Sequence, residues 1–375
     1  MPRIILLSPY HTGSHAAWAE GYARHSRHRL RLLTMAGRFW KWRMQGGAIE
    51  LAQQVGEACQ TGERPDALVI TDMVNLPALQ ALARPWLDAV PTLFYAHENQ
   101  LTYPPPPGVT RDLTYGLINV LSMACANRIA FNSQHHLDEF FAELPRLLKH
   151  FPDYNHLEII PQLRDKSLVL PVGLDLARLD ACRTPPRPAG APLRILWNQR
   201  WEYDKNPAEF FDALYALDAA GLPFEVCVAG ENFRQQPAEF EATRAQLGSH
   251  IVHWGYAESR DAYARLLWEA DLVLSTADHE FFGISVLEAM YCGCYPLLPH
   301  RLSYPELLPT EAHSAHLYRG FDDLVARLKW AALHPALVRQ IDLSPVAARY
   351  DWRHLAPVYD AVLADLAGQG QGERP

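Results

Sequence analysis

Two glutamates with a glycine between them concentrate the chemistry of this sequence. Glu280 and Glu288 are eight residues apart, and Gly283 lies between them. The apolar run 271–276 predicts a buried parallel strand, and 284–291 predicts a helix. One carboxylate then precedes the helix and the other lies about one turn inside it, so both can face one ligand. Open α/β sheets bind ligands where a loop leaves the carboxyl end of a strand, and a helix N-terminus favours an anion. The alternative is an ordinary surface loop and acidic helix.

Two cations follow the first strand expected in the second half of the chain. Arg200 and Lys205 come directly after the apolar run 193–197 and precede the next expected helix. A departing diphosphate needs charge stabilisation of this kind. Surface ion pairs with Glu202 and Asp204 are the alternative use of the two cations.

Several common phosphate and metal motifs do not occur in the sequence. No Gly-x-x-x-x-Gly-Lys-Ser/Thr and no Gly-x-Gly-x-x-Gly is found, which disfavours a P-loop NTPase or an ordinary dinucleotide dehydrogenase. There is no Asp-x-Asp either, so nothing demands a metal or another cofactor. The six cysteines are scattered, which predicts reduced, buried thiols in a cytoplasmic protein rather than disulfides or a zinc site.

Charge is distributed unevenly along the 375 residues. The net charge is −8, but residues 1–43 hold eight Lys/Arg against one acid, which leaves +7 there and −15 in the rest. Within this part, residues 38–43 interleave aromatic rings with cations, a pattern that can stack bases and hold phosphates. Packing of the aromatic pair at the domain rim is the alternative. No apolar run approaches the ~20 residues of a membrane span, and the N-terminus does not resemble a signal peptide.

The elements that must position these residues alternate between strands and helices. Strands are expected at 4–8, 29–34, 67–71, 92–96, 128–132, 167–170, 193–197, 224–229, 250–253, 272–275 and 295–298. Helices are expected at 16–25, 76–83, 113–126, 134–143, 208–219, 237–247, 260–268, 284–291, 321–333, 336–341 and 352–366. Residues 9–15 form a glycine-containing loop in this scheme, with Ser14 as a helix cap.

This alternation predicts an α/β protein with two doubly wound parallel sheets facing across a cleft. The proline-rich segment 183–192 is the expected linker. It separates an N-terminal domain (1–182) from a C-terminal domain (193–342), and 343–375 is expected to be a final helix with a disordered Gly/Gln tail.

These residues resemble the retaining glycosyltransferases of the GT-B fold. Glu280 and Glu288 match the E-x7-E signature of that class, Arg200 and Lys205 its donor-diphosphate pair, and Gly13 its N-domain glycine loop. The sequence is most similar to one family, the tRNA-queuosine α-mannosyltransferases. The blocks that carry this resemblance are 13–15, 40–43, 97–104, 200–205, 253–256, 279–283 and 291–296. They span nearly the whole chain in order, and the departure is an abbreviated linker.

The resemblance implies transfer of mannose from GDP-mannose to the cyclopentenediol of queuosine in the tRNA anticodon loop, with retention. The residues it places at the reaction are Glu280, Arg200, Lys205 and His97. Those it places at the donor are Gly13, Arg200, Lys205, Phe281, Phe282, Gly283 and Glu288. For the acceptor, the candidates are Ser14, His15, Trp40, Trp42, Arg43, Asn99 and Tyr103.

The implied roles differ along the cleft. Arg200 and Lys205 hold the diphosphate, Glu280 contacts sugar hydroxyls, and Glu288 contacts the ribose. His97 lies near the reacting sugar, unless it is a strand-end histidine bonded to backbone. Backbone amides near residues 282–283 add to phosphate binding, and no nucleophile is assigned.

The implied partners are a queuosine-containing tRNA and a nucleotide-sugar donor, without a metal or a membrane, for a cytoplasmic monomer or weak oligomer. Two alternatives stay open. One is the same enzyme class with a lipid or polysaccharide acceptor, which favours an amphipathic basic helix. The other is a sugar-nucleotide-binding protein without turnover.

Overall fold

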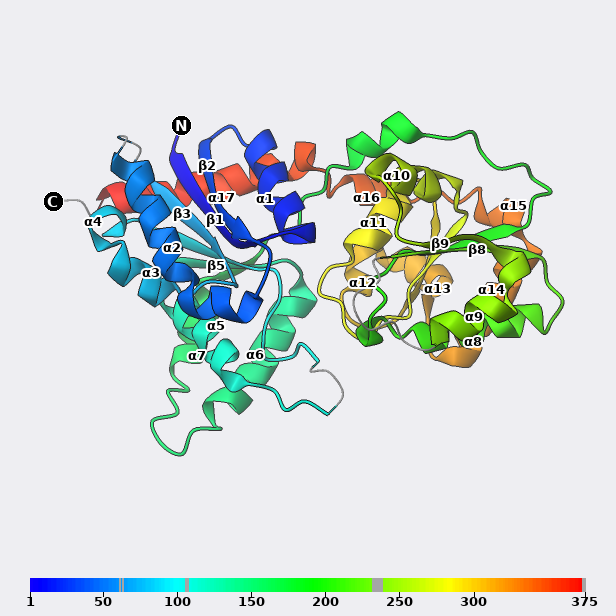
Figure 1. Cartoon of the computed structure of the whole chain (residues 1–375), viewed down its shortest axis with the longest axis horizontal. Coiled ribbons are helices and arrows are strands. Elements are labelled where there is room, and N and C mark those ends of the chain that lie inside the picture. Colours follow the sequence, from blue (N-terminus) through cyan, green and yellow to red (C-terminus); the bar gives the residue numbers. More distant parts are fainter. Residues whose placement is uncertain (61, 63, 105–107, 231–238, 373–375) are drawn as a thin grey trace. The chain divides into compact units, whose positions relative to one another are not determined.

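Two six-stranded parallel sheets form the framework of the computed structural model (Figure 1). The structure describes residues 1–60, 62, 64–104, 108–230 and 239–372. The chain divides into two compact units, Met1–Leu174 with Trp352–Pro375, and Asp175–Asp351. The α/β class expected from the strand-helix alternation is therefore confirmed.

The first unit is built on the strand order β2-β1-β3-β4-β5-β6. The strands are β1 (Arg3–His11), β2 (Arg29–Ala36), β3 (Ala67–Thr71), β4 (Thr92–Ala96), β5 (Arg128–Phe131) and β6 (Ser167–Val169). The helices are α1 (Gly13–His25), α2 (Trp40–Gln60), α3 (Leu76–Leu82), α4 (Arg84–Leu87), α5 (Leu113–Cys125), α6 (Gln134–Leu148), α7 (Ile159–Asp165) and α17 (Trp352–Gly372). Every residue of β3 and β4 is buried, as expected for central strands of a parallel sheet that is covered on both faces.

One local expectation in this unit is wrong, and one helix was not predicted. Helix α1 begins at Gly13 with Thr12 at the N-cap, so Ser14 lies inside the helix and does not cap it. The helix that was not predicted is α2, which begins at Trp40 within the basic aromatic segment. The buried residues of α2 follow helical spacing; they include Met44, Ala48, Leu51 and Val55. The adjacent glycines at 46 and 47 obscure this pattern in the sequence.

The C-terminal helix belongs to the first unit. The Tyr22 hydroxyl donates to Asp360 at 2.8 Å, and Trp18 Nε1 donates to the Tyr359 hydroxyl at 3.1 Å. Helix α17 continues to Gly372, so the tail expected to be disordered is helical as far as that residue. Residues 373–375 lie outside the described part of the chain.

The second unit has the strand order β12-β11-β10-β7-β8-β9. Its strands are β7 (Leu193–Trp197), β8 (Phe224–Ala229), β9 (Ile251–Gly255), β10 (Leu272–Leu274), β11 (Tyr295–Pro299) and β12 (Leu317–Tyr318). The helices are α8 (Pro207–Asp218), α9 (Glu239–Gln246), α10 (Arg260–Glu269), α11 (Ile284–Tyr291), α12 (Tyr304–Leu307), α13 (His313–His316), α14 (Phe321–Leu333), α15 (Pro335–Val338) and α16 (Ser344–Ala348). The helix expected at 237–247 has its first two positions outside the described residues.

The segment 175–192, which includes the expected linker, also belongs to the second unit. Trp268 Nε1 donates to the carbonyl of Leu179 at 2.7 Å, and the Tyr291 hydroxyl donates to Asp180 at 3.0 Å. The units therefore divide at 174/175 and at 351/352, rather than around the proline-rich stretch. The high proline content predicts a linker at 183–192, but the hydrogen bonds of Trp268 and Tyr291 show that the segment packs on the second unit.

Two further expectations concern thiols and membranes. None of the six cysteines, all of which lie in the described part of the chain, forms a disulfide. Cys125 is exposed and Cys182 is half-buried, so burial holds for only the other four. Among the helices that the structure describes, none combines the length and apolar character needed to cross a bilayer.

Candidate active site

Lys205 is a buried cation of the second unit. It ends a short 3-10 helix (Tyr203–Lys205) between β7 and α8. Its Nζ donates to the carbonyl of His279 at 2.8 Å and lies 3.2 Å from Asp204 Oδ2 and 3.4 Å from Glu280 Oε2. Burial lowers the pKa of Lys205, but the nearby Glu280 and Asp204 carboxylates outweigh it and the pKa is raised overall. Lys205 is therefore a fixed, protonated cation.

The backbone around Lys205 is held by the end of the neighbouring strand. The Thr276 hydroxyl donates to the carbonyls of Lys205 and Asn206 at 2.9 and 3.0 Å. Asn206 has a φ of 49° and caps α8, since its side chain accepts the N–H of Glu209. Asparagine tolerates the left-handed region better than most residues, which explains its place at this tight turn.

The positive charge of Lys205 favours the ionised form of Glu280. Burial raises the pKa of Glu280, but Lys205 and a hydrogen bond from the Phe282 N–H outweigh it, so the pKa is lowered. That N–H donates to Glu280 Oε1 at 3.2 Å. The Phe282 amide, a candidate for phosphate binding, is thus engaged by Glu280 in this structure. The side chains of Phe281 and Phe282 are buried.

Gly283 is required by the backbone where α11 begins. Its φ is 103°, and an added Cβ would lie 2.9 Å from Leu307 Cδ1. A side chain at this N-cap would therefore be both strained and crowded.

Glu288 lies in α11 in a different environment from that of Glu280. Its Oε2 accepts a hydrogen bond of 2.9 Å from the Tyr263 hydroxyl, which accepts in turn from Asn198 Nδ2 at 3.1 Å. Burial raises the pKa of Glu288. Because the two glutamate pKa values move in opposite directions, they suit different roles: Glu280 as a fixed anion, and Glu288 as a hydrogen-bonding carboxyl.

Arg200 is the more accessible of the two cations. Its Nη1 lies 3.1 Å from Glu202 Oε2, and its side chain is 43% exposed. The positive charge of Arg200 contributes to lowering the pKa of Glu280 and opposes protonation of Lys205. Arg200, Lys205 and Glu280 therefore lie close enough in the second unit for each charge to affect the pKa of its neighbours.

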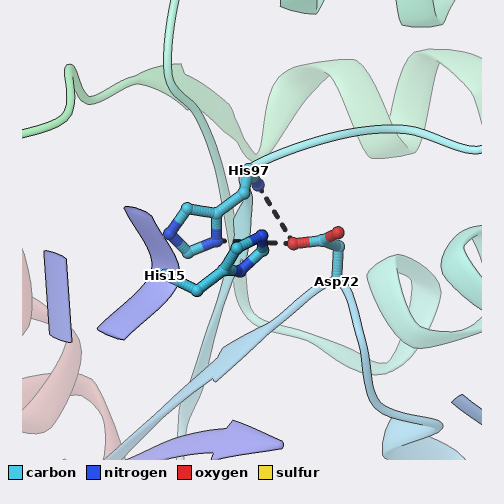
Figure 2. Close-up of side chains that lie close together, drawn as sticks. All are labelled: His15, Asp72 and His97. Atoms are coloured by element: carbon cyan, nitrogen blue, oxygen red, sulfur yellow. Dashed lines mark hydrogen bonds and ion pairs between the residues drawn. The ribbon is translucent and has the colours of Figure 1, made fainter. Parts of the chain in front are cut away.

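In the first unit, His15, Asp72 and His97 gather at the carboxyl edge of the sheet (Figure 2). Asp72 follows β3 and His97 follows β4, and His15 lies in the first turn of α1. Asp72 Oδ1 accepts the backbone N–H of His97 at 3.1 Å and lies 3.4 Å from His97 Nδ1. The two imidazole rings are 4.3 Å apart between centroids.

Burial sets the protonation of this cluster. It lowers the pKa of His97 to about 3, so the imidazole is neutral at physiological pH. Burial also raises the pKa of Asp72, while His15 and backbone N–H groups act in the opposite direction. His97 Nε2 is buried and makes no hydrogen bond to any residue that the structure describes. It can therefore meet a ligand atom.

The same three side chains are also the candidate metal ligands. Their ligand atoms all lie within 4.8 Å of one another. Two imidazoles and a carboxylate form a set that transition metals accept. The sequence reasoning expected no metal, and it did not single out Asp72.

Two other acceptor candidates, Asn99 and Tyr103, make hydrogen bonds within the segment that follows β4. Asn99 Oδ1 accepts the N–H groups of Leu101 and Thr102 at 3.0 Å each, so this oxygen holds the loop after β4. Tyr103 is half-buried, and its carbonyl accepts from Arg111 at 2.9 Å. Gly13 and Ser14 are exposed at the start of α1.

The two tryptophans expected at the acceptor lie in different environments in the structure. Trp40 packs on Tyr115 at 5.0 Å between ring centroids and lies against the cluster that contains Met44. Trp42 is 57% exposed. The guanidinium of Arg43 donates to the carbonyl of Ala36 at 3.3 and 3.1 Å and so braces the turn before α2. The packing alternative therefore describes Trp40 but not Trp42.

Comparison with known proteins decides the family. The model described as "tRNA-queuosine alpha-mannosyltransferase N-terminal" matches residues 3–174, and "Glycosyl transferases group 1" matches residues 186–331. A Drosophila melanogaster protein, tRNA-queuosine alpha-mannosyltransferase, is 32% identical over 339 residues, which cover 87% of this chain and 86% of the relative. The chain belongs to the tRNA-queuosine alpha-mannosyltransferase family. It is a glycosyltransferase, and specifically a mannosyltransferase, so the expectation of an enzyme is confirmed.

More distant likenesses support the family's fold. Sucrose-phosphate synthase from Thermosynechococcus elongatus superimposes with a TM-score of 0.69 at 13% identity, covering 98% of this chain and 100% of that one. A glycosyltransferase from Rickettsia africae gives 0.68 at 13% identity, covering 100% and 99%. The GT-B fold expected from the sequence is confirmed by these neighbours and the two parallel sheets.

Proposed function

We propose that this mannosyltransferase transfers mannose from GDP-mannose to the cyclopentenediol of queuosine in a tRNA anticodon loop, with retention. The observation that carries the proposal is the 32% identity to the Drosophila relative over 87% of this chain. That relative's name contains the sugar, the modified nucleoside and an alpha linkage. An alpha product from an alpha-linked donor corresponds to retention.

The choice of GDP-mannose rests on a second relative. A Mycobacterium tuberculosis protein named GDP-mannose-dependent alpha-(1-6)-phosphatidylinositol dimannoside mannosyltransferase is 28% identical over 151 residues, which cover 39% of each chain. In the proposal, Arg200 and Lys205 hold the diphosphate. Glu280 contacts sugar hydroxyls, and Glu288 contacts the ribose. The buried Lys205–Glu280 pair of 3.4 Å supports this assignment, because it presents a fixed cation beside an ionised carboxylate.

The proposed chemistry takes place on one face of the sugar. The bond between the anomeric carbon and the phosphate oxygen breaks while the acceptor oxygen bonds to that carbon, and the leaving phosphate takes the acceptor proton. Arg200 and Lys205 stabilise the departing charge, so we propose that the diphosphate needs no metal. His97 contacts a sugar hydroxyl through its Nε2, a role that suits a neutral imidazole with no hydrogen-bond partner on Nε2 among the described residues.

For the acceptor, we propose a queuosine-containing tRNA that meets the basic N-terminal segment. Residues 1–43 carry +7 on a protein whose net charge is −8. The proposed contact residues are Ser14, His15, Trp42, Arg43, Asn99 and Tyr103, with Trp40 as packing support. We propose a monomer or weak oligomer that works in the cytoplasm.

The test is incubation of the protein with GDP-mannose and queuosine-containing tRNA, followed by nucleoside mass spectrometry. A hexose on queuosine supports the proposal, and queuosine-free tRNA is the control. If active protein adds no hexose to queuosine, the acceptor assignment is wrong. Replacing GDP-mannose with UDP or ADP sugars tests the donor separately.

A lipid acceptor is the second candidate, because two partial relatives act on such molecules by name. One is the Mycobacterium tuberculosis protein; the other is GDP-mannose:cellobiosyl-diphosphopolyprenol alpha-mannosyltransferase of Xanthomonas campestris, 26% identical over 177 residues, which cover 46% of this chain and 47% of that one. Transfer of radiolabelled mannose to an extracted lipid fraction, with none to tRNA, would favour this candidate.

A further inference from the structure

Phe39 is an exposed aromatic residue on a strained backbone. Its side chain is 77% exposed, and its φ is 55°. Its carbonyl accepts the N–H groups of Trp42 at 2.8 Å and Arg43 at 3.1 Å, so Phe39 forms the turn that starts α2. A bulky residue with this φ is a genuine outlier, and glycine would fit without strain. An exposed ring adds little to folding, so the outlier points to a role outside the fold.

Trp42 offers a second exposed ring on the first turn of the same helix. Its indole lies against Gly46, because a Cβ at Gly46 would come within 2.5 Å of Trp42 Cζ2. A glycine inside a helix costs stability relative to alanine. Here it provides room for the indole to lie close to the helix backbone, with 57% of the tryptophan still exposed.

We propose that Phe39 and Trp42 form a stacking surface for unpaired nucleotides of RNA. The inference rests on the proposed function and deepens it by naming the residues that meet the acceptor's unpaired loop. Unpaired bases stack on aromatic side chains, and nearby cations hold the phosphates. Arg38 and Lys41 supply that charge: both are exposed and adjoin Phe39 and Trp42 in the sequence, and Lys41 Nζ lies 5.6 Å from the Trp40 ring centroid. Trp40, which lies between them in the sequence, packs on Tyr115.

The charge and shape of α2 favour RNA over a membrane. Exposed aromatic and basic residues also occur on membrane-surface helices, which need an apolar face along their length. The apolar face of α2 is buried in the unit, at residues such as Leu51 and Val55. Beyond the first turns, its exposed positions are polar, such as Glu50, Gln53 and Glu57, apart from Ile49. The exposed rings are therefore local to residues 39–42, a size that fits one or two bases.

The experiment measures binding of a fluorescently labelled anticodon stem-loop RNA and of a blunt duplex with the same stem. Phe39→Gly removes the ring and relieves the backbone strain, so its melting temperature should equal or exceed that of the wild type. Gly46→Ala keeps both rings but displaces the Trp42 indole. We expect each variant to lose roughly 10-fold or more in stem-loop affinity, with duplex binding nearly unchanged.

Tyr154→Gly serves as the matched control, because it also removes an exposed ring (82%) from a residue with a positive φ (46°), lies outside residues 38–43, and should retain stem-loop affinity. Wild-type affinity in both Phe39→Gly and Gly46→Ala overturns the inference. So does binding to anionic phospholipid vesicles, lost in the same variants, with none to the stem-loop. Failure of the proposed function has a different signature: stem-loop binding that depends on Phe39 while wild-type protein adds no hexose to queuosine.

Discussion

The hydroxyl of Tyr263 donates a 2.9 Å hydrogen bond to Glu288 and accepts one of 3.1 Å from Asn198. The residues come from three places in the chain: α10, α11 and the end of β7. The Tyr263 hydroxyl is the side-chain group that fixes Glu288 Oε2. Glu288 is the carboxyl that we assign to the donor ribose, so Tyr263 is a positioning residue for donor binding.

Tyr263→Phe should therefore weaken donor binding more than it slows turnover. Loss of one hydrogen bond to a carboxylate is worth about 1.5–3 kcal/mol, so the KM for the donor should rise roughly 10-fold or more, with kcat changed little. Tyr295→Phe is the matched control, because its hydroxyl bonds to the Ala315 carbonyl in the same unit. An unchanged KM in Tyr263→Phe, or an equal rise in the control, would contradict the assignment.

Arg200→Ala should reduce turnover without unfolding the protein. The side chain is 43% exposed and its ion-pair partner Glu202 is 26% exposed, so loss of this pair should cost the fold little. If Arg200 stabilises the departing diphosphate, kcat should fall ~10²-fold or more. Glu202→Gln removes only the ion-pair partner and should keep most of the activity. Steady-state kinetics and a thermal melt separate these effects; wild-type kcat in Arg200→Ala rules out the role.

Acid should destabilise the protein through His97. Its folded-state pKa is lowered by burial to about 3 from an ordinary 6.5, so below pH 6.5 the unfolded chain binds a proton that the folded chain does not. This contribution to stability is complete above pH 6.5 and is lost as the pH falls toward 3. Between pH 6.5 and 5, it amounts to about 2 kcal/mol of unfolding free energy.

Urea unfolding at several pH values checks this expectation. His97→Gln should show a shallower decline between pH 6.5 and 5 than the wild type. His156→Gln replaces a histidine whose side chain is 66% exposed and should keep the wild-type decline. Identical slopes for His97→Gln and the wild type would mean that His97 is protonated in the folded protein.

Chelation should leave mannosyl transfer intact. The proposed diphosphate site uses Arg200 and Lys205, so dialysis against EDTA should not lower kcat. His15, Asp72 and His97 nevertheless form a set that accepts a transition metal, so the metal content of the purified protein should be measured as well. Activity lost on chelation and regained with one metal, but absent in Asp72→Asn, would place a required ion at this cluster.

The sequence predicted where in the fold several candidate residues lie, because each follows an apolar run. His97 comes directly after β4, and Lys205 and Glu280 lie in the segments that follow β7 and β10. Asp72 obeys the same rule after β3 and was missed, because no neighbouring motif drew attention to it. Tyr263 lies in the middle of a helix, and only the packing of α10 against α11 brings it to Glu288.

Other differences come from the limits of local patterns. Helix α2 was not predicted because glycines 46 and 47 have low helix propensity. Gly46 is nevertheless needed inside the helix, where a Cβ would collide with Trp42. Trp40 and Trp42 look equivalent in sequence, but they point to opposite environments because they are two apart on a helix. The unit assignment of 175–192 depends on long-range hydrogen bonds that no local pattern encodes.

The placement of α17 in the first unit has a consequence for synthesis on the ribosome. The polypeptide passes from the first unit to the second after Leu174 and returns at Trp352. Asp175–Asp351 is therefore contiguous and can fold as soon as it emerges, whereas the unit that begins the chain waits for its last helix. Until α17 packs, the surfaces of Trp18 and Tyr22 that it covers remain exposed and can bind chaperones. A premature stop codon before Trp352 would leave these surfaces exposed permanently.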